Sequence, residues 1–553
     1  MRERATRFGF KASCLRTTRR SNNTGQLLRK RERRGRRGRL VQKETRLGLR
    51  ADADACCACR STAPLRISNS VAKRRGGVCL VSQGADSVGS SDSAKAKAQW
   101  KLPVLGSSPY DAEIFKLAFP ALFAVLLDPL MSMVDTAIIG RIGVNELAGT
   151  GLAGLMWATF TVALFQFLAT AITPLVSGAN ARGDKETVSR TICTGMWLAV
   201  SIGTLLFVLK YVGAEWFLQN VFTSSEEVVS NSMKYLDARI FSVHATLIQL
   251  VCIGAFRGLK DTRTILYTTV IANVLNVILD VIFIFQFGWG VGGAAASSTI
   301  STILSCSLLL YSLLKTKKWA PKDIFPPPRR QESMPVLSAG LALSSKSMVT
   351  MYTIGLASQA IAQLGAVSLA AHEVIKQLFF FCYIAVEPIS IAGQSLIAEC
   401  LGKKEISEAK RVAYRLVQLA VSLGVVMGLM VYFAGPKLVH IFTKEEQVIG
   451  VTTSVIGVVA FFQPMDALML AQEGVLLGAR EHTYISRSVI ATSLTCFLAL
   501  YTMTKTLSLS YTLLHVWLCV KILTIGRATF SSARLYVSKH SPIRKPVSVD
   551  NPT

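Results

Sequence analysis

Two short segments decide the fold: Phe256-Arg-Gly-Leu-Lys-Asp-Thr-Arg263 and, 220 residues later, Leu476-Leu-Gly-Ala-Arg-Glu-His-Thr483. Each lies between two long apolar runs, with a glycine and an acidic residue at matching places. Two further pairs keep nearly the same offset, namely Gly143–Ala148 with Gly365–Ala370 and Ala179–Glu186 with Ala398–Glu405. The sequence therefore predicts two similar halves, an arrangement typical of secondary transporters, in which the substrate path runs between repeats.

The composition is that of a membrane protein preceded by a basic leader. Of the 553 residues, 51% are hydrophobic and only 17% are charged, which is too little charge for a soluble surface of this size. Residues 1–100 carry 25 of the 61 Lys and Arg but only seven of the 33 acidic residues. They lack a long apolar run, which favours an organellar transit peptide, here a plastid one, over a secretory signal. The basic run Leu28–Arg39 contains no aromatic residue, which argues against a nucleic-acid-binding arm.

From Ala112 onward, twelve apolar stretches are long enough to cross a bilayer. They lie near 113–139, 147–174, 190–212, 232–256, 264–287, 291–314, 335–362, 367–395, 411–434, 448–475, 484–505 and 509–531. The even-numbered connections carry eighteen Lys and Arg, against seven on the opposite side. This asymmetry supports an even number of spans with both chain ends on the positive side.

The predicted fold is an all-α polytopic membrane protein of two six-helix bundles related by an internal pseudo-two-fold repeat. The proline-rich loop Pro326–Pro328 falls where six spans meet six and indicates the linker between the halves. The expected organisation is a leader (1–100), an N-terminal lobe (110–315), a linker (316–334), a C-terminal lobe (335–533) and a tail (534–553).

Ionisable residues inside the predicted spans are the candidate site, because burying a carboxylate at mid-bilayer costs at least ~2.5 kcal/mol. Asp128 and Asp135 share one face of the first span, since seven residues at about 100° each leave them roughly 20° apart. The fifth span carries Asn273, Asn276 and Asp280, with Asn276 one turn before Asp280. If these two polar faces meet, repulsion and lost solvation favour a shared proton, which makes a reversible proton site.

Several of these residues also have a structural interpretation. Asn273 can simply hydrogen-bond one helix to another, and Asp128, which precedes Pro129, can satisfy backbone groups at a kink. Glu373 and Lys376 lie at i, i+3 and can neutralise each other. The candidates for substrate or gating contacts in the second half are His372, Glu373, Lys376, Glu387, Asp466 and Glu473. No Cys or His pair at a zinc spacing accompanies Cys56–Cys59, so no metal site is predicted.

Five motifs occur in order along the chain: Pro129–Gly140, Glu146–Gly149, Gly254–Thr262, Ala272–Asp280 and Gly290–Ala296. Together they resemble the multidrug and toxic compound extrusion (MATE) family, specifically its DinF-like branch with plastid-targeted plant members. The resemblance covers about 110–535. It implies two six-helix bundles in a V-shaped arrangement and cation-coupled antiport of organic solutes, including export of salicylate-type phenolics by some relatives.

Carried over residue by residue, the resemblance makes Asp135 the proton-linked aspartate and places Asn276 and Asp280 in the fifth-helix cluster. The chain departs from the family at Val281, where proline is usual. The acidic residues that sodium-coupled relatives use in the second lobe have no clean match, which favours protons over sodium ions as the coupling ion.

The resemblance and the acidic residues together predict a secondary transporter of a plastid membrane that exports organic solutes, xenobiotics or phenolic metabolites. We expect no cofactor and no nucleic-acid or obligate protein partner, and we expect a monomer that contacts membrane lipid. The alternative is a flippase of the same architecture that moves a lipid-linked substrate, but its cavity should be cationic. An enzyme is disfavoured, because the six histidines are dispersed and no catalytic or P-loop motif is present.

Overall fold

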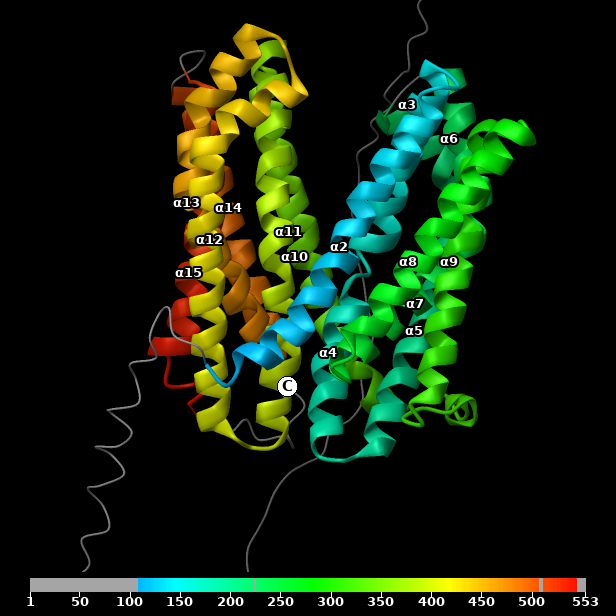
Figure 1. The fold of residues 1–553 in the computed structure, drawn as a ribbon, viewed down its shortest axis with the longest axis vertical. Helices are drawn as coiled ribbons and strands as arrows, with labels where there is room; N and C mark the ends of the chain where they lie inside the picture. The colour runs from blue at the N-terminus through cyan, green and yellow to red at the C-terminus, as the bar shows by residue number, and fades with distance from the viewer. Residues whose placement is uncertain (1–107, 223–224, 507–510, 545–553) are drawn as a thin grey trace, which may run out of the picture. The chain divides into compact units, whose positions relative to one another are not determined.

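The computed structural model describes residues 108–222, 225–506 and 511–544, which are almost entirely helical (Figure 1). The leader predicted at 1–100 and the end of the tail lie outside the described residues. The first half forms α2 (Asp111–Ile139), α3 (Val144–Trp157), η1 (Ala158–Ala163), α4 (Phe167–Ala181), α5 (Lys185–Phe217), η2 (Leu218–Phe222), α6 (Glu226–Arg239), η3 (Ile240–Ser242), α7 (Val243–Gly258), α8 (Thr262–Asp280), η4 (Val281–Gln286) and α9 (Gly290–Lys315). The second half follows η5 (Pro321–Ile324) and forms α10 (Arg330–Ala362), α11 (Ala366–Gly402), α12 (Ile406–Phe442), α13 (Glu446–Gly478), α14 (His482–Thr506), α15 (Leu513–Ser532) and η7 (Ala533–Val537).

These elements make twelve long rods in two bundles of six, because α3 runs on into α4 and α6 runs on into α7. We term the bundle of α2 to α9 the N-lobe and the bundle of α10 to α15 the C-lobe. Within the described residues, eleven rods have the length and apolarity of a membrane span. The twelfth is α10, whose apolar run is interrupted by Ser344, Ser345 and Lys346. The prediction of two six-helix bundles is confirmed.

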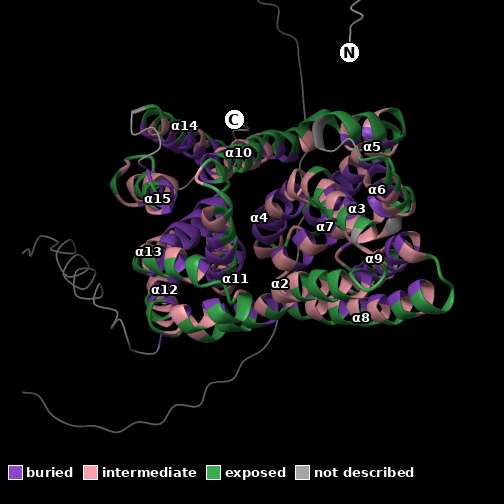
Figure 2. Cartoon of the chain, turned by 90° about the horizontal axis from the view of Figure 1, so that it is seen from above, coloured by how far each residue is buried: buried purple, intermediate pink, exposed green. Residues whose placement is uncertain are grey.

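Buried residues fill the interior of each bundle, and exposed residues cover the outward faces (Figure 2). Many of the exposed side chains are large and apolar, among them Phe461, Val212 and Phe433, which are 78%, 77% and 71% exposed. A soluble protein rarely presents so much apolar surface. The chain is a multi-pass membrane protein whose outer helix faces meet lipid.

The two halves repeat one helix–turn–helix geometry. The turns that follow α4, α7, α11 and α13 each contain one residue in the left-handed region, with φ between 61° and 74°: Gly183, Lys260, Lys404 and Arg480. In each turn, the next residue is acidic and donates its backbone amide to the carbonyl five residues earlier: Asp184 to Ala179, Asp261 to Phe256, Glu405 to Cys400 and Glu481 to Leu476. Such a bond closes the end of a helix. The sequence segments that recur in the two halves therefore form equivalent helix ends.

Small residues bring the central helices of each lobe into backbone contact. A Cβ atom on Gly254 of α7 would lie 2.6 Å from the carbonyl oxygen of Ala169 on α4. In the C-lobe, a Cβ atom on Gly474 of α13 would lie 2.6 Å from the carbonyl oxygen of Ser390 on α11. The glycine one turn later is equally crowded in both lobes. Glycines spaced four apart allow this close approach in membranes, so α7 packs on α4 as α13 packs on α11.

The lobes touch at the end that carries the positive loops. Helix α11 of the C-lobe packs on α2 and α4 of the N-lobe, and Figure 1 shows the bundles together at this end and apart at the other. The Ser177 hydroxyl donates to the Ser395 carbonyl at 2.7 Å, and the Ser395 hydroxyl donates to the Arg257 carbonyl at 2.7 Å. A Cβ atom on Gly402 would lie 2.6 Å from the carbonyl oxygen of Gly178, so the lobes meet backbone to backbone.

Candidate functional site

Asp135 of α2 and Asp280 of α8 lie together inside the N-lobe. Their carboxyl groups are in hydrogen-bond contact, and only 1% of Asp280 is exposed. Each group has one buried oxygen that accepts no hydrogen bond while both groups are ionised. These atoms are Oδ1 of Asp135 and Oδ2 of Asp280. A single proton on either group supplies a donor, because a carboxylic acid can donate to a carboxylate. The arrangement therefore suits two carboxyl groups that share one proton.

Polar neighbours hold Asp280 in position. Ser297 of α9 donates its hydroxyl to the Asp280 carboxylate, and the Asn276 amide donates to the Ser297 hydroxyl oxygen at 3.2 Å. Arg239 at the end of α6 interacts electrostatically with Asp135, although it forms no ion pair with it in the described part of the chain. Asn276 and Asp280 thus belong to one hydrogen-bonded group, as their spacing on one helix face predicts.

The helix changes type immediately after Asp280. Helix α8 ends at Asp280, and the π-helical segment η4 begins at Val281. A π-turn widens the helix and recurs at functional sites, and here it directly follows the carboxyl pair. Asn273 lies two turns earlier, and its buried amide nitrogen contacts no acceptor among the described residues. The helix-to-helix bond considered for Asn273 is therefore not seen.

Asp128 does not join this pair, although it was expected on the same helix face as Asp135. It interacts instead with Arg257 of α7 and with Glu387 of α11, and its side chain is exposed between the lobes. Asp128 lies seven residues before Asp135 on the continuous helix α2, roughly 10 Å away along its axis, so the two can share a face without touching. Arg257 thus faces one carboxylate from each lobe.

Glu473 of α13 is bound by two cations inside the C-lobe. Arg527 of α15 binds it through two nitrogen atoms, at 2.7 and 2.8 Å, and Lys346 of α10 donates to it at 2.6 Å. At most 19% of any of these three side chains is exposed. A carboxylate so fully paired is stabilised in its ionised form. Glu473 therefore joins three helices and is poorly placed to exchange a proton.

Asp466, two turns before Glu473, is paired in the same way. Lys521 and Thr524, both on α15, donate to its two oxygen atoms at 2.6 Å each. Both side chains of the ion pair are nearly inaccessible, at 2% and 7% exposure. Like Glu473, Asp466 links helices through bonds to both of its oxygen atoms.

The start of α11 carries the remaining candidates. Glu373 and Lys376 form an exposed ion pair at 2.6 Å, which confirms the prediction that they neutralise each other. His372 is buried against Trp517, with ring centroids 5.7 Å apart. No contact in the described part of the chain connects these residues to Asp135 and Asp280, so the second-half candidates do not form one site with the first.

Charged contacts between the lobes close the positive end, and sequence reasoning missed them. We term these contacts the clasp; it comprises Asp111 with Arg415, Lys260 with Glu399, and Tyr110 with Glu408. Arg415 binds Asp111 through two nitrogen atoms, at 2.7 and 2.8 Å. Lys260 lies 2.6 Å from Glu399 and 2.6 Å from Glu113. Every contact of the clasp joins the N-lobe to the C-lobe and must break before the lobes separate at this end.

Lys260 lies in the turn between α7 and α8, outside the spans. Burial alone would lower the pKa of its ammonium group, but the hydrogen bonds and charges of Glu113 and Glu399 outweigh burial and raise its pKa above its ordinary value. A lysine with a raised pKa keeps its stabilising charge at every pH below that value and loses it only in strongly alkaline solution. The Lys260 contacts therefore persist through the physiological pH range.

Arg415→Gln is expected to loosen the clasp, because Asp111 loses two charge-assisted hydrogen bonds. We expect opening at the positive end to become roughly tenfold more frequent, which corresponds to about 1.4 kcal/mol. The measurement is the rate at which a membrane-impermeant maleimide labels Ser177→Cys, a buried lobe-contact position, in a background without native cysteines. The charge swap Asp111→Arg with Arg415→Asp should restore slow labelling. Equal labelling rates with and without the Arg415→Gln substitution would show that this contact does not hold the lobes together.

Two repeated six-helix bundles that meet at one end and bury ionisable residues define the class of two-lobe membrane transporters. The family model MatE matches the chain twice, over residues 120–282 and 341–502. Together the matches span more than half of the chain, and the chain belongs to the MatE family. One model matching both halves also confirms the internal repeat. Members of this family are transporters, so the protein is a membrane transporter and not an enzyme.

Relatives and solved structures resemble the chain over most of its helical part. Protein DETOXIFICATION 42 of Arabidopsis thaliana is 29% identical over 461 residues, which cover 71% of this chain and 86% of that protein. Protein DETOXIFICATION 44, chloroplastic, from the same plant is 27% identical over 402 residues, which cover 70% and 76%. The outward-facing conformation of a multidrug resistance MATE family transporter of the MOP superfamily has a TM-score of 0.68 at 16% identity, covering 77% of this chain and 95% of that one. This likeness shows a shared fold.

Proposed function

We propose that the protein is an antiporter that exports small organic solutes in exchange for protons, with Asp135 and Asp280 as the proton site. The observation that carries the proposal is the carboxyl pair, whose two donorless buried oxygens call for one proton. Two adjacent ionised carboxylates repel each other in a poorly solvated site, so losing the shared proton is costly unless the site changes its surroundings. That cost is what allows proton binding to favour one conformation over another.

The clasp supplies the second conformational element. The clasp joins the lobes at the positive end, and the bundles lie apart at the opposite end (Figure 1). An antiporter must hold solute and proton alternately, which requires that each one bind better to a different state of the lobes. Asp128 of the N-lobe and Glu387 of the C-lobe both interact with Arg257, and we propose that these three residues contact the solute.

The named relatives support the solute class and the membrane. A protein called DETOXIFICATION and a multidrug resistance transporter share the family or the fold, which supports organic solutes and xenobiotics as cargo. The relative called chloroplastic supports the plastid destination that the basic leader predicts. We propose that the protein acts there as a monomer, since each chain holds both lobes of the path.

The test is solute flux in proteoliposomes under imposed gradients, with a fluorescent organic cation and radiolabelled salicylate as separate cargoes. We expect flux to follow a pH gradient and to ignore an equal sodium gradient. Flux that follows sodium and not pH would overturn the proton assignment. Transfer of a lipid-linked sugar without flux of either solute would overturn the antiporter and favour the flippase.

A further inference from the structure

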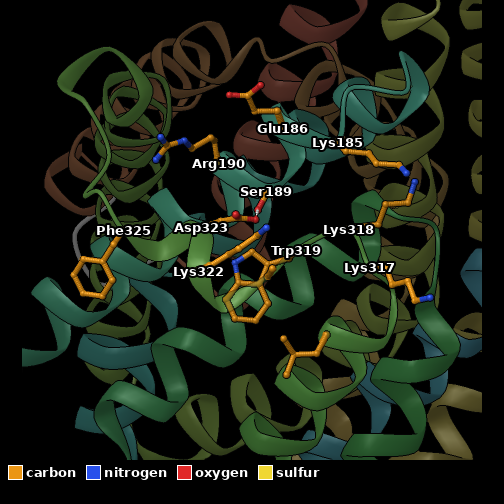
Figure 3. Close-up of a pocket in the computed structure, with 12 residues that line it drawn as sticks. Lys185, Glu186, Ser189, Arg190, Lys317, Lys318, Trp319, Lys322, Asp323 and Phe325 are labelled. Carbon is orange, nitrogen blue, oxygen red and sulfur yellow. Dashed lines mark hydrogen bonds between the residues drawn. The ribbon is translucent and has the colours of Figure 1, made fainter.

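A cavity of about 710 Å³ lies at the positive end of the N-lobe, separate from the carboxyl pair (Figure 3). It is an open groove bordered by the start of α5, the end of α9 and the linker segment that contains η5. Three segments distant in sequence contribute its cations: Lys185 and Arg190 come from α5, Lys317 and Lys318 follow α9, and Lys322 belongs to η5. We term this cavity the linker groove.

Little negative charge balances these cations. The groove has two carboxylates, Glu186 and Asp323, and the Asp323 carboxylate already accepts a hydrogen bond from Ser189 at 2.6 Å. None of the five cations forms an ion pair with a carboxylate in the part of the chain that the structure describes. The clasp, in contrast, pairs its cations with carboxylates. Unbalanced cations crowded into one hollow repel each other unless an anion binds there.

Hydrogen bonds to uncharged acceptors hold the walls of the groove in place and leave its cations unneutralised. The Trp197 indole donates to the Ile324 carbonyl at 3.0 Å, and Arg190 donates to the Pro326 carbonyl at 3.2 Å. Lys318 donates to the side-chain oxygen of an asparagine at 3.0 Å. These bonds fix the linker against α5, so the groove exists before any ligand arrives and its cations keep their full charge.

Two side chains that line the groove are apolar and exposed. Phe325 is 72% exposed and Leu314 is 39% exposed, and both line the same cavity as the cations. Figure 3 shows Phe325 on the opposite side of the groove from Lys317 and Lys318. A small soluble anion would leave these apolar side chains bare, whereas a lipid would cover them with its acyl chains.

We propose that the linker groove binds an anionic lipid from the leaflet on the positive side, with its phosphate or sulfonate group against the lysines and its chains along Phe325 and Leu314. Basic pockets between helix ends recognise such headgroups, and each Lys or Arg near the surface contributes about fivefold in affinity. The bound lipid holds the linker against the N-lobe. Because the linker is the covalent connection to α10 of the C-lobe, the lipid resists movement of one lobe against the other. This inference does not depend on the proposed antiport.

The experiment measures lipid retained by the full-length protein after purification with phosphatidylcholine and phosphatidylglycerol, by native mass spectrometry. The groove variant is Lys317→Gln with Lys322→Gln, two exposed side chains that form no ion pair in the described chain. The matched control is Lys404→Gln with Lys539→Gln, two exposed lysines on the same side of the membrane. We expect wild type and control to retain phosphatidylglycerol in preference to phosphatidylcholine, and the groove variant to bind it at least tenfold more weakly.

Several results would overturn the proposal. Equal retention of phosphatidylglycerol by the two double variants would place the lipid elsewhere, and equal retention of both lipids by wild type would remove the charge preference. Inorganic phosphate tests the source of the anion. Displacement of the lipid by millimolar phosphate would make the groove a soluble-anion site, whereas we expect phosphate to leave the lipid in place. Equal elution of both variants in size-exclusion chromatography ensures that lost retention does not reflect lost folding.

Discussion

Asp135→Asn is expected to abolish solute flux driven by a pH gradient, reducing it to the level of liposomes without protein. Asparagine cannot release a proton, so the pair with Asp280 can no longer alternate between its protonated and ionised forms. The fold should survive, because the amide of asparagine can still donate a hydrogen bond to the Asp280 carboxylate. We expect the free energy of unfolding to change by no more than about 1 kcal/mol.

The measurement compares initial rates of gradient-driven flux in proteoliposomes of wild type, Asp135→Asn and Glu373→Gln. Glu373→Gln is the matched control, because it also removes one carboxylate from a membrane helix but from an exposed ion pair with Lys376. It should transport like wild type. Flux of Asp135→Asn equal to that of wild type would make Asp135 a structural residue and would refute the proton site proposed for the N-lobe.

The repeat and the spans could be predicted because they are local properties of the chain. Apolar runs of membrane length define helices, and the recurring turn motifs after α7 and α13 mark equivalent helix ends. The pairing of Asp135 with Asp280 was predictable for a similar reason, since charges inside apolar helices must find polar partners. Asn276 followed from its spacing, because it lies one helical turn before Asp280.

The partners that lie far apart in the sequence could not be predicted. Arg415 and Asp111 are separated by 304 residues, and nothing in helical periodicity says which helix of the other lobe a side chain will meet. Ser297 contacts Asp280, but it is one of many serines in apolar helices. Nothing in the sequence therefore distinguishes Ser297 as the partner of Asp280. The neighbours of Asp128 could not be predicted either, because Arg257 lies on α7 and Glu387 on α11 of the other lobe.

Glu473→Gln is expected to destabilise the protein by roughly 3–5 kcal/mol, the cost of removing one partner from a buried ion pair. The substitution leaves Lys346 and Arg527 facing each other inside the C-lobe, where little water can solvate them. The free energy of unfolding in detergent, measured by denaturant titration, checks this value. Glu373→Gln again serves as the control, because an exposed pair contributes only about 0–1 kcal/mol.

The two substitutions should separate stability from coupling. If Glu473 is a counter-ion that joins three helices, then Glu473→Gln protein that remains folded should still carry solute in proportion to the pH gradient, because its proton site is intact. Asp135→Asn should show the reverse, with normal stability and no coupled flux. A Glu473→Gln protein of normal stability that no longer responds to pH would contradict this division. The proton site would then belong to the C-lobe, and Lys346 and Arg527 would be the groups that tune it.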